Sequence, residues 1–366
     1  MKAVVLSEIG GRLAIEDIPT PQPKAGEVLV KVAACGVCHT DLHVIKGEVK
    51  FPLPCVLGHE ISGVVEEVPA DVKAVRPGAA VVCSFIMPCG VCHYCVRGRD
   101  DLCETFFAMN RLKGTLYDGQ SRLRRPDGSP LAMYSMGGLA EYAVVPATDV
   151  FAAPANVPLT DACILGCAMM TAYGALKNQA RVQPNESVAV VGTGGVGSNV
   201  IQLARAFGAS QIIAVDIRDD KLAAAKELGA THGVNAAMGD AVAEVLSITG
   251  GRGADVAIEA LGRPQTVVNA FMMTRDGGRV VVIGIAPGTT TAGIEITRLV
   301  RRGIHLMGSY GSRVRTDMPD VLGLAAHGRV SPSRPITRRY RLEQADEAYA
   351  ALSRGEIIGR AILTLA

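Results

Sequence analysis

The chain contains 366 residues, of which 49% are apolar, and this length fits about two domains rather than one core. Lys and Arg number 37 against 35 Asp and Glu, so the formal net charge is +2. That balance argues against nucleic acid or an anionic membrane as the main partner. Aromatic residues reach only 4%, which also disfavours stacking on nucleic-acid bases. Neither a signal-peptide pattern nor a bilayer-length apolar run is present, so we expect a cytoplasmic protein without a membrane partner.

The first third of the chain has the pattern of β-strands. Residues 27–33 alternate polar and apolar side chains, as a half-buried strand does, and residues 63–68 and 79–82 are similar. Residues 104–137 are polar and basic and contain several Gly turns. We predict a long surface excursion there rather than a core element.

Ten cysteines are present, and without a signal peptide they suggest metal binding rather than disulfides. Four of them follow the spacing C-x2-C-x2-C-x7-C, namely Cys89, Cys92, Cys95 and Cys103. Short spacers bring the thiolates to one point, and four sulfurs complete a closed tetrahedral zinc site. The spacing alone leaves an iron–sulfur cluster as the main alternative. Four free thiols are the less favoured alternative, because clustered thiols oxidise readily.

From about residue 169, short apolar runs alternate with helical patterns. The expected strands are 187–191, 211–216, 254–259, 279–285 and 304–308, and the expected helices include 196–207 and 219–228. Continuous β-branched runs between helices predict an α/β fold with a doubly wound parallel sheet covered on both faces. The last residues return to mixed character, with a helix expected at 342–353 and a strand at 361–365.

A G-x-G-x-x-G motif, residues 192–197, follows the first of these strands and opens the first helix. Its glycines allow a tight turn, a close approach of the backbone to a pyrophosphate, and close helix–strand packing. Asp216 ends the next strand, where a carboxylate hydrogen-bonds the ribose hydroxyls and repels a 2′-phosphate. This favours NAD over NADP, although Arg218 and Lys221 lie close enough in sequence to offset part of that repulsion.

Several metal-capable residues lie outside the four-cysteine segment. They are Cys38, His39, Asp41, His43, His59, Glu60 and Cys167. None of them has the close spacing of a metal signature. Taken singly, each is better explained as a core thiol or a surface histidine.

The order of the motifs changes this interpretation. GVCHTD at 36–41, GHE at 58–60, the four cysteines, GC-x3-T at 166–171 and GTGGVG at 192–197 follow one another along the chain. In this order and spacing they resemble the zinc-dependent alcohol dehydrogenases of the medium-chain dehydrogenase/reductase superfamily, over essentially the whole chain. The resemblance implies a GroES-like β-rich catalytic domain at 1–168 with a structural zinc lobe at 89–103. It also implies a Rossmann NAD-binding domain at 169–308 and a return to the catalytic domain at 309–366.

The resemblance implies a role for each motif residue. Cys38, His59 and Cys167 would hold the catalytic zinc, and Cys163 is the one alternative ligand. The four clustered cysteines would hold the structural zinc. Their match to the structural zinc lobe of the family favours zinc over an iron–sulfur cluster at that site. Thr40 and His43 match a proton relay, Asp41 a carboxylate that orients the zinc-bound histidine, and Glu60 an acid behind the metal. The cofactor-binding positions are His39, Thr171, Gly192, Gly194, Gly195, Val196, Gly197, Asp216, Lys221 and Ile285. Phe85, Met133 and Tyr134 match the substrate pocket.

The implied activity is a zinc-dependent, NAD-linked alcohol dehydrogenase with two zinc ions per chain. It would transfer hydride reversibly between NAD and a small alcohol, primary or aromatic, to give an aldehyde or ketone. The alternatives are a thiol-adduct formaldehyde dehydrogenase or a secondary-alcohol or polyol dehydrogenase of the same superfamily, and, less favoured, a nucleotide-binding structural protein. The segment 104–137 is similar to the long loop of the dimeric enzymes, which implies a homodimer, with a homotetramer as the alternative.

Overall fold

A computed structural model describes residues 1–365 of the chain. Two compact units are present, one formed by Met1–Met170, Arg313–Gly328 and Ile336–Ala366, the other by Thr171–Ser312 and Arg329–Pro335. The sequence placed 309–366 in the first domain as one block, whereas residues 309–312 and 329–335 group with the second unit. One contact that keeps residues 329–335 there is the hydrogen bond from the Ser331 amide to the Gln202 side chain, at 2.9 Å.

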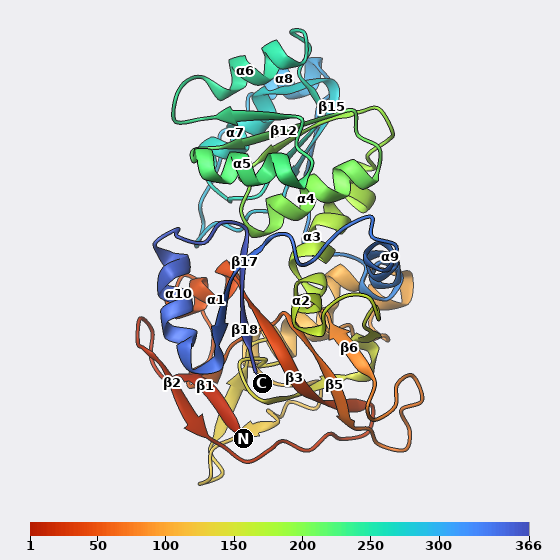
Figure 1. Cartoon of the computed structure of the whole chain (residues 1–366), viewed down its shortest axis with the longest axis vertical. Helices are drawn as coiled ribbons and strands as arrows, with labels where there is room; N and C mark the ends of the chain where they lie inside the picture. Colours follow the sequence, from red (N-terminus) through yellow and green to blue (C-terminus); the bar gives the residue numbers. More distant parts are fainter. Residues whose placement is uncertain (366) are drawn as a thin grey trace. The chain divides into compact units, whose positions relative to one another are not determined.

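Two β-sheets form the framework of the first unit (Figure 1). The larger sheet has the order β10 (Val150–Ala152), β6 (Ala80–Cys83), β5 (Ile61–Glu67), β3 (Glu27–Val37), β18 (Arg360–Thr364) and β17 (Ile336–Arg341), with β9 (Tyr142–Pro146) also paired to β3. The smaller sheet has the order β2 (Leu13–Asp17), β1 (Lys2–Leu6), β4 (Cys55–Val56), β8 (Pro130–Met133) and β7 (Leu123–Arg124). The helices of this unit are α1 (His39–Ile45), α2 (Leu159–Ala162), α9 (Val314–Ala326) and α10 (Ala345–Ser353).

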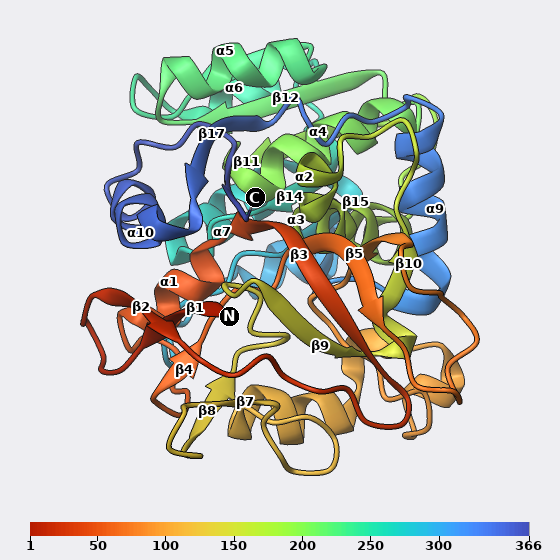
Figure 2. The same cartoon turned by 60° about the horizontal axis from the view of Figure 1, so that its bottom comes forward.

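Strand β3 is the centre of the larger sheet. It is longer than its sequence pattern predicted, because the apolar stretch beyond residue 33 remains in the sheet, and Lys31 is the one exposed residue along it. It pairs with β5, β9 and the C-terminal strand β18 (Figure 2). This pairing with β18 explains why the last residues of the chain belong to the first unit.

The expectation of a surface excursion at 104–137 is wrong. This segment contains a π-helix, Phe106–Arg111, together with β7 and β8, and it buries large apolar side chains. The fully buried ones include Phe106, Leu116, Leu123, Leu131, Met133 and Met136. Polar turn residues separate these buried side chains, which therefore recur with neither a strand period nor a helix period. Only the polar turns were recognisable in the sequence.

The second unit is a doubly wound parallel sheet, as predicted. Its strands run in the order β13 (His232–Asn235), β12 (Gln211–Asp216), β11 (Ser187–Val191), β14 (Ala254–Glu259), β15 (Thr274–Val282) and β16 (His305–Gly308), and every neighbouring pair is parallel. The helices are α4 (Gly195–Ala206), α5 (Asp219–Leu228), α6 (Ala241–Ile248), α7 (Pro264–Met272) and α8 (Ile296–Arg301). Because the strand order reverses at β11, α4 and α5 cover one face and α6 and α7 the other (Figure 1).

Helix α3 (Ala168–Gly174) lies within a longer helical stretch, Leu159–Ala180. By length and composition this stretch could cross a membrane, but 89% of its apolar window is buried inside the protein. Burial of this kind is typical of the core helix of a folded domain.

Two leucines in the 104–137 segment provide a test of its packing. Leu116 is 1% exposed and Leu112 is 70% exposed. We expect Leu116→Ala to lower the free energy of unfolding by about 2–5 kcal/mol, because it leaves a cavity. Leu112→Ala should change it by less than about 0.5 kcal/mol. Equal denaturation midpoints for the two variants would contradict a packed core in this segment.

Candidate active site

Three predicted metal ligands come together in the first unit. Cys38 follows β3, His59 precedes β5 and Cys167 precedes α3. Their ligand atoms, with those of Glu60, all lie within 4.8 Å of one another, and none of the three side chains is more than 6% exposed. Two thiols and one imidazole are donors that zinc prefers. The cluster therefore fits a zinc ion with one position left for another ligand.

A buried carboxylate fixes the orientation of His59. Asp41 Oδ1 lies 3.0 Å from His59 Nδ1 and accepts a hydrogen bond of 3.1 Å from the Gly58 amide. Asp41 Oδ2 accepts a hydrogen bond of 2.8 Å from the Tyr349 hydroxyl. With Nδ1 held by Asp41, Nε2 is the nitrogen left for a metal. Tyr349 was missed by the sequence analysis, because it is 308 residues from Asp41 and no local motif marks it.

The two thiols of the cluster differ in acidity. A hydrogen bond from Cys167, helped by the charge of His59, holds the pKa of Cys38 well below its usual range. Burial and that same hydrogen bond raise the pKa of Cys167. Burial opposes the charged form of His59, but the charges of Asp41 and Cys38 outweigh it and raise its pKa to about 9. The cluster therefore stabilises one thiolate beside one cation, and a divalent ion can replace the protons.

Glu60, the fourth group of this cluster, is buried and pairs with Arg360 of β18. Glu60 is 0% exposed and Arg360 is 4% exposed. A Cβ atom at Gly36 would lie 2.0 Å from Glu60 Oε2, so no larger residue fits opposite this carboxylate. Arg360 is a second contact that the sequence did not reveal, since it comes from the last strand of the chain.

The predicted relay residues lie on α1. The Cys38 thiol is 3.6 Å from the Thr40 hydroxyl, so Thr40 adjoins the metal cluster. His43 is half-buried, and its Nδ1 contacts the Glu48 carboxylate. His39 begins the same helix and is exposed. Thr40 and His43 therefore run from the cluster towards the surface along one helix.

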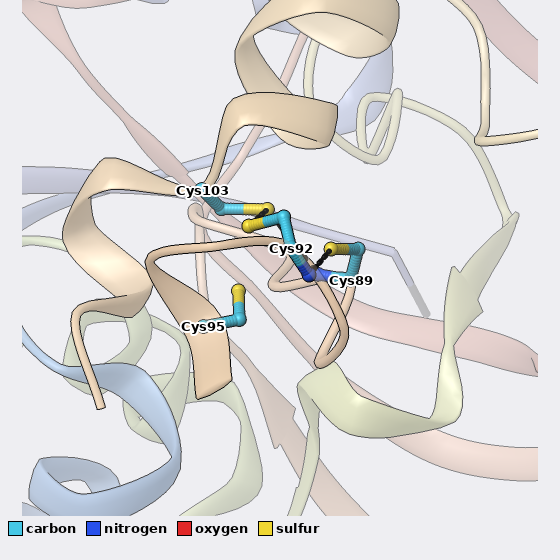
Figure 3. Close-up of side chains that lie close together, drawn as sticks. All are labelled: Cys89, Cys92, Cys95 and Cys103. Carbon is cyan, nitrogen blue, oxygen red and sulfur yellow. Dashed lines mark hydrogen bonds between the residues drawn. The ribbon is translucent and has the colours of Figure 1, made fainter. Parts of the chain in front are cut away.

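The four clustered cysteines form a second group of donors. Their sulfur atoms lie within 4.8 Å of one another and point towards a common centre (Figure 3). The Cys103 sulfur accepts hydrogen bonds from the amides of Cys89, at 3.3 Å, and Phe106, at 3.4 Å. Against the effect of burial, hydrogen bonds from the amides of Cys95 and Glu104 lower the pKa of Cys92 to about 6. Amide groups that stabilise thiolates fit a closed, four-sulfur metal site.

Arg315 of α9 fixes this lobe to the rest of the first unit. Its guanidinium donates to the Asp100 carboxylate at 2.7 Å and to the Cys95 carbonyl at 2.5 Å. The other cysteines, Cys35, Cys55, Cys83 and Cys163, are all buried, as predicted. The Cys163 thiol lies 3.3 Å from the Thr160 carbonyl, and Cys163 is not part of the cluster around Cys38.

The glycine-rich turn of the second unit joins β11 to α4. Gly192 has φ +89°, which favours glycine. A Cβ atom at Gly197 would lie 1.9 Å from the Gly192 carbonyl oxygen, so helix and turn meet too closely for a side chain. Asp216, at the end of β12, accepts hydrogen bonds from the Thr193 amide at 2.9 Å and hydroxyl at 3.0 Å. The geometry is that of a dinucleotide-binding turn.

The other predicted cofactor residues lie on α3, on α4 and α5, and after β15. Gly194 precedes α4, Gly195 and Val196 open it, and Lys221 lies in the first turns of α5. Ile285 follows β15 and is 41% exposed, while Thr171 is a buried residue of α3. Arg218 was the residue expected to offset part of the repulsion between Asp216 and the 2′-phosphate of NADP. Its guanidinium contacts the Asp220 carboxylate.

Two predicted pocket residues lie beside His59, the candidate metal ligand. The rings of Phe85 and Tyr134 lie edge-on to the His59 ring, with centroids 6.0 and 5.9 Å away. Met133 is fully buried. The guanidinium of Arg111 lies 4.2 Å from the Tyr134 ring centroid, and the sequence analysis missed it.

Comparison with known proteins identifies both units. The family described as "Alcohol dehydrogenase GroES-like domain" matches residues 24–155, and "Zinc-binding dehydrogenase" matches residues 195–327. A curated "NDMA-dependent alcohol dehydrogenase" of Amycolatopsis methanolica is 36% identical, covering 99% of this chain and 98% of its own. A "Putative alcohol dehydrogenase D" of Mycobacterium tuberculosis is also 36% identical, with 97% of each chain covered.

Solved structures agree with these relatives. An alcohol dehydrogenase zinc-binding domain protein from Burkholderia ambifaria has a TM-score of 0.93 at 36% identity, covering 100% of this chain and 98% of its own. The benzyl alcohol dehydrogenase of Acinetobacter calcoaceticus has the same TM-score at 31% identity, covering 100% and 99%. Fold and sequence together define an oxidoreductase with a GroES-like and a Rossmann-type unit. The chain belongs to the zinc-type alcohol dehydrogenases of the medium-chain dehydrogenase/reductase superfamily, which confirms the resemblance.

The Tyr349–Asp41 hydrogen bond gives a test of how His59 is held. We expect Tyr349→Phe to release Zn²⁺ from the Cys38 cluster to a chelator about tenfold more readily, because Asp41 then orients His59 less firmly. Tyr340→Phe is the matched control, since its hydroxyl contacts Arg338 instead. Chelator competition followed by metal analysis measures the release. Equal retention in both variants would exclude a positioning role for Tyr349.

Proposed function

We propose that the protein is a zinc-dependent, NAD-linked alcohol dehydrogenase that interconverts small alcohols with their aldehydes or ketones. The observation that carries this proposal is the buried cluster of Cys38, His59 and Cys167, in which Asp41 holds the histidine. A structural protein of this fold would need neither that cluster nor the Thr40–His43 pair beside it. The less favoured structural alternative therefore leaves this buried cluster of potential metal ligands unexplained.

Each group of residues has a defined part in this chemistry. Cys38, His59 and Cys167 would hold zinc, which supplies a Lewis acid for the alcohol oxygen, while NAD supplies the hydride acceptor. Thr40 would accept a hydrogen bond from the substrate hydroxyl and release its own hydroxyl proton as it takes the substrate's, and His43 would be the outer group that gives a proton to solvent. Asp41 keeps His59 Nε2 directed at the metal, and Glu60 with Arg360 fills the space behind it.

The preference for NAD rests on Asp216. In the described structure this carboxylate ends β12 and accepts two hydrogen bonds from Thr193 of the glycine turn. A carboxylate at this place hydrogen-bonds a ribose diol and repels a 2′-phosphate. Arg218 contacts Asp220, so part of its charge is already neutralised.

The four-cysteine lobe would hold a second zinc ion, whose role is structural because four sulfurs leave no open position. None of the ten cysteines forms a disulfide, which fits a reducing compartment such as the cytoplasm. For the substrate we favour primary or aromatic alcohols, supported by the aromatic rings beside His59 and by the benzyl alcohol dehydrogenase among similar structures. Thiol-adduct formaldehyde oxidation and secondary-alcohol or polyol oxidation are the alternatives.

The test is nicotinamide reduction by the purified protein with a panel of primary, aromatic, branched and secondary alcohols. We expect NADH formation with NAD, weaker formation with NADP, and loss of the signal after zinc chelation. Because one relative is named NDMA-dependent, each assay is repeated with NDMA. Turnover with NDMA but not with NAD alone would change the electron acceptor of the proposal, and no turnover with any alcohol under either condition would exclude it.

Two cysteine variants serve as the controls of this assay. Cys38→Ala should abolish turnover and leave nucleotide binding intact, because it removes a ligand of the open site. Cys95→Ala should chiefly lower the melting temperature, because it opens the closed site. Each variant should contain one zinc ion less than the wild type. Full activity of Cys38→Ala would contradict the proposed metal chemistry.

We also propose that the enzyme forms a homodimer through strand β16. This strand is an edge of the second unit's sheet, and Leu306 on it is 38% exposed. Ile296 and Val300 on α8 are 75% and 71% exposed. An apolar sheet edge of this kind is a template for pairing. Light scattering after size exclusion should give a dimer for the wild type and a monomer for Leu306→Lys, while an unchanged mass for the variant would rule out this surface.

A further inference from the structure

Arg111 places a positive charge next to the aromatic rings of the candidate substrate pocket. It is the last residue of the π-helix Phe106–Arg111, and all three of its guanidinium nitrogens are buried. Its guanidinium carbon lies 4.2 Å from the ring centroid of Tyr134, 5.2 Å from that of Phe106 and 5.8 Å from that of Phe85. A guanidinium on three aromatic rings is held in one place by cation–π contacts.

Two of these three rings also contact the metal-binding histidine. The centroids of Phe85 and Tyr134 lie 6.0 and 5.9 Å from that of His59. The guanidinium and the metal cluster are therefore separated by little more than one layer of aromatic side chains.

A buried hydrogen-bond network holds this arrangement in place. Asn110, next to Arg111, is 0% exposed, and its amide donates to the carbonyls of Met133 at 3.3 Å and Ser135 at 2.8 Å. The Ser135 hydroxyl donates in turn to the Phe85 carbonyl at 2.6 Å. One network thus fixes the π-helix, the segment that carries Tyr134, and Phe85. Short π-helical segments are frequent at functional sites, because they redirect one side chain.

We propose that Arg111 is a specificity-determining residue that binds a carboxylate at the end of the substrate opposite to the reacting alcohol or aldehyde carbon. This inference rests on the proposed function and narrows its substrate class to hydroxy acids and carboxy-aldehydes with an aromatic or short aliphatic spacer. A planar guanidinium matches a carboxylate with two parallel hydrogen bonds, which a lysine does not reproduce. Because Phe85 and Tyr134 contact both the guanidinium and the His59 ring, a substrate that reaches from one group to the other would run along these two rings.

The test compares benzyl alcohol with 4-(hydroxymethyl)benzoate, which differ only in the carboxylate. We expect the wild type to prefer the carboxylate in kcat/KM by about 10- to 100-fold, the range of a charge-assisted hydrogen bond. Arg111→Met should lose that preference, so that the ratio of kcat/KM for the two alcohols falls to about 1, and Arg111→Lys should fall between. Lys113→Met, two residues away and exposed, is the control for general electrostatic attraction and should behave as the wild type.

A second measurement does not depend on turnover. Titration calorimetry of the zinc-loaded protein with 4-(hydroxymethyl)benzoate should give binding that Arg111→Met weakens and Lys113→Met does not. With the wild type alone, 4-(aminomethyl)benzyl alcohol should be a poorer substrate than benzyl alcohol, so the inference remains testable if the Arg111 variants fail to fold. Equal kcat/KM for the charged and neutral alcohols would overturn it while leaving the proposed function intact. Arg111-dependent binding of the carboxylate without turnover of any alcohol would overturn the function instead.

Discussion

The arrangement of the candidate active site depends on the buried carboxylate of Asp41. It receives hydrogen bonds from the Gly58 amide and the Tyr349 hydroxyl and contacts His59 Nδ1. The segments that carry Asp41, Gly58–His59 and Tyr349 therefore meet at one carboxylate, which is 0% exposed. A buried carboxylate is costly unless every oxygen is satisfied. The partners that satisfy it also direct His59 at the metal position, so the stability of this region and the geometry of the metal site have the same origin.

The C-terminal return of the chain serves the same site from the other side. Strand β18 pairs with β3 and carries Arg360, which neutralises Glu60 behind the cluster, and α10 carries Tyr349. The first unit is therefore incomplete without residues that follow the nucleotide-binding unit in sequence. The proposed metal ligands all come before residue 168, yet the contacts that hold two of the cluster's neighbours, Asp41 and Glu60, come from the end of the chain.

The elements predicted most accurately from the sequence are those that depend on interactions between residues close together in the chain. The strands at 187–191, 211–216 and 254–259 and the helix at 219–228 have the predicted bounds, because strand runs, helix periods and glycine stops are local signals. The four-cysteine lobe was equally visible, since its donors lie within fifteen residues. Other contacts were not visible, because Asp41–Tyr349 and Glu60–Arg360 join residues about three hundred positions apart. The segment 104–137 was misjudged because polar turns interrupt its buried side chains.

That misjudged segment also carries Arg111 and Tyr134, to which we assign a part in substrate recognition. A scaffold of metal ligands and a glycine turn accounts for the type of reaction but does not by itself select the alcohol. The choice between alcohols must come from side chains around the metal position that such motifs do not contain. Here the buried hydrogen bonds of Asn110 and Ser135 fix Phe85 and Arg111 relative to one another. An apolar pocket distinguishes neighbouring alcohols only weakly, whereas a fixed guanidinium separates charged from neutral ones strongly. On the proposal made here for Arg111, the irregular backbone of the π-helix Phe106–Arg111 would be what adds a particular specificity to a common scaffold.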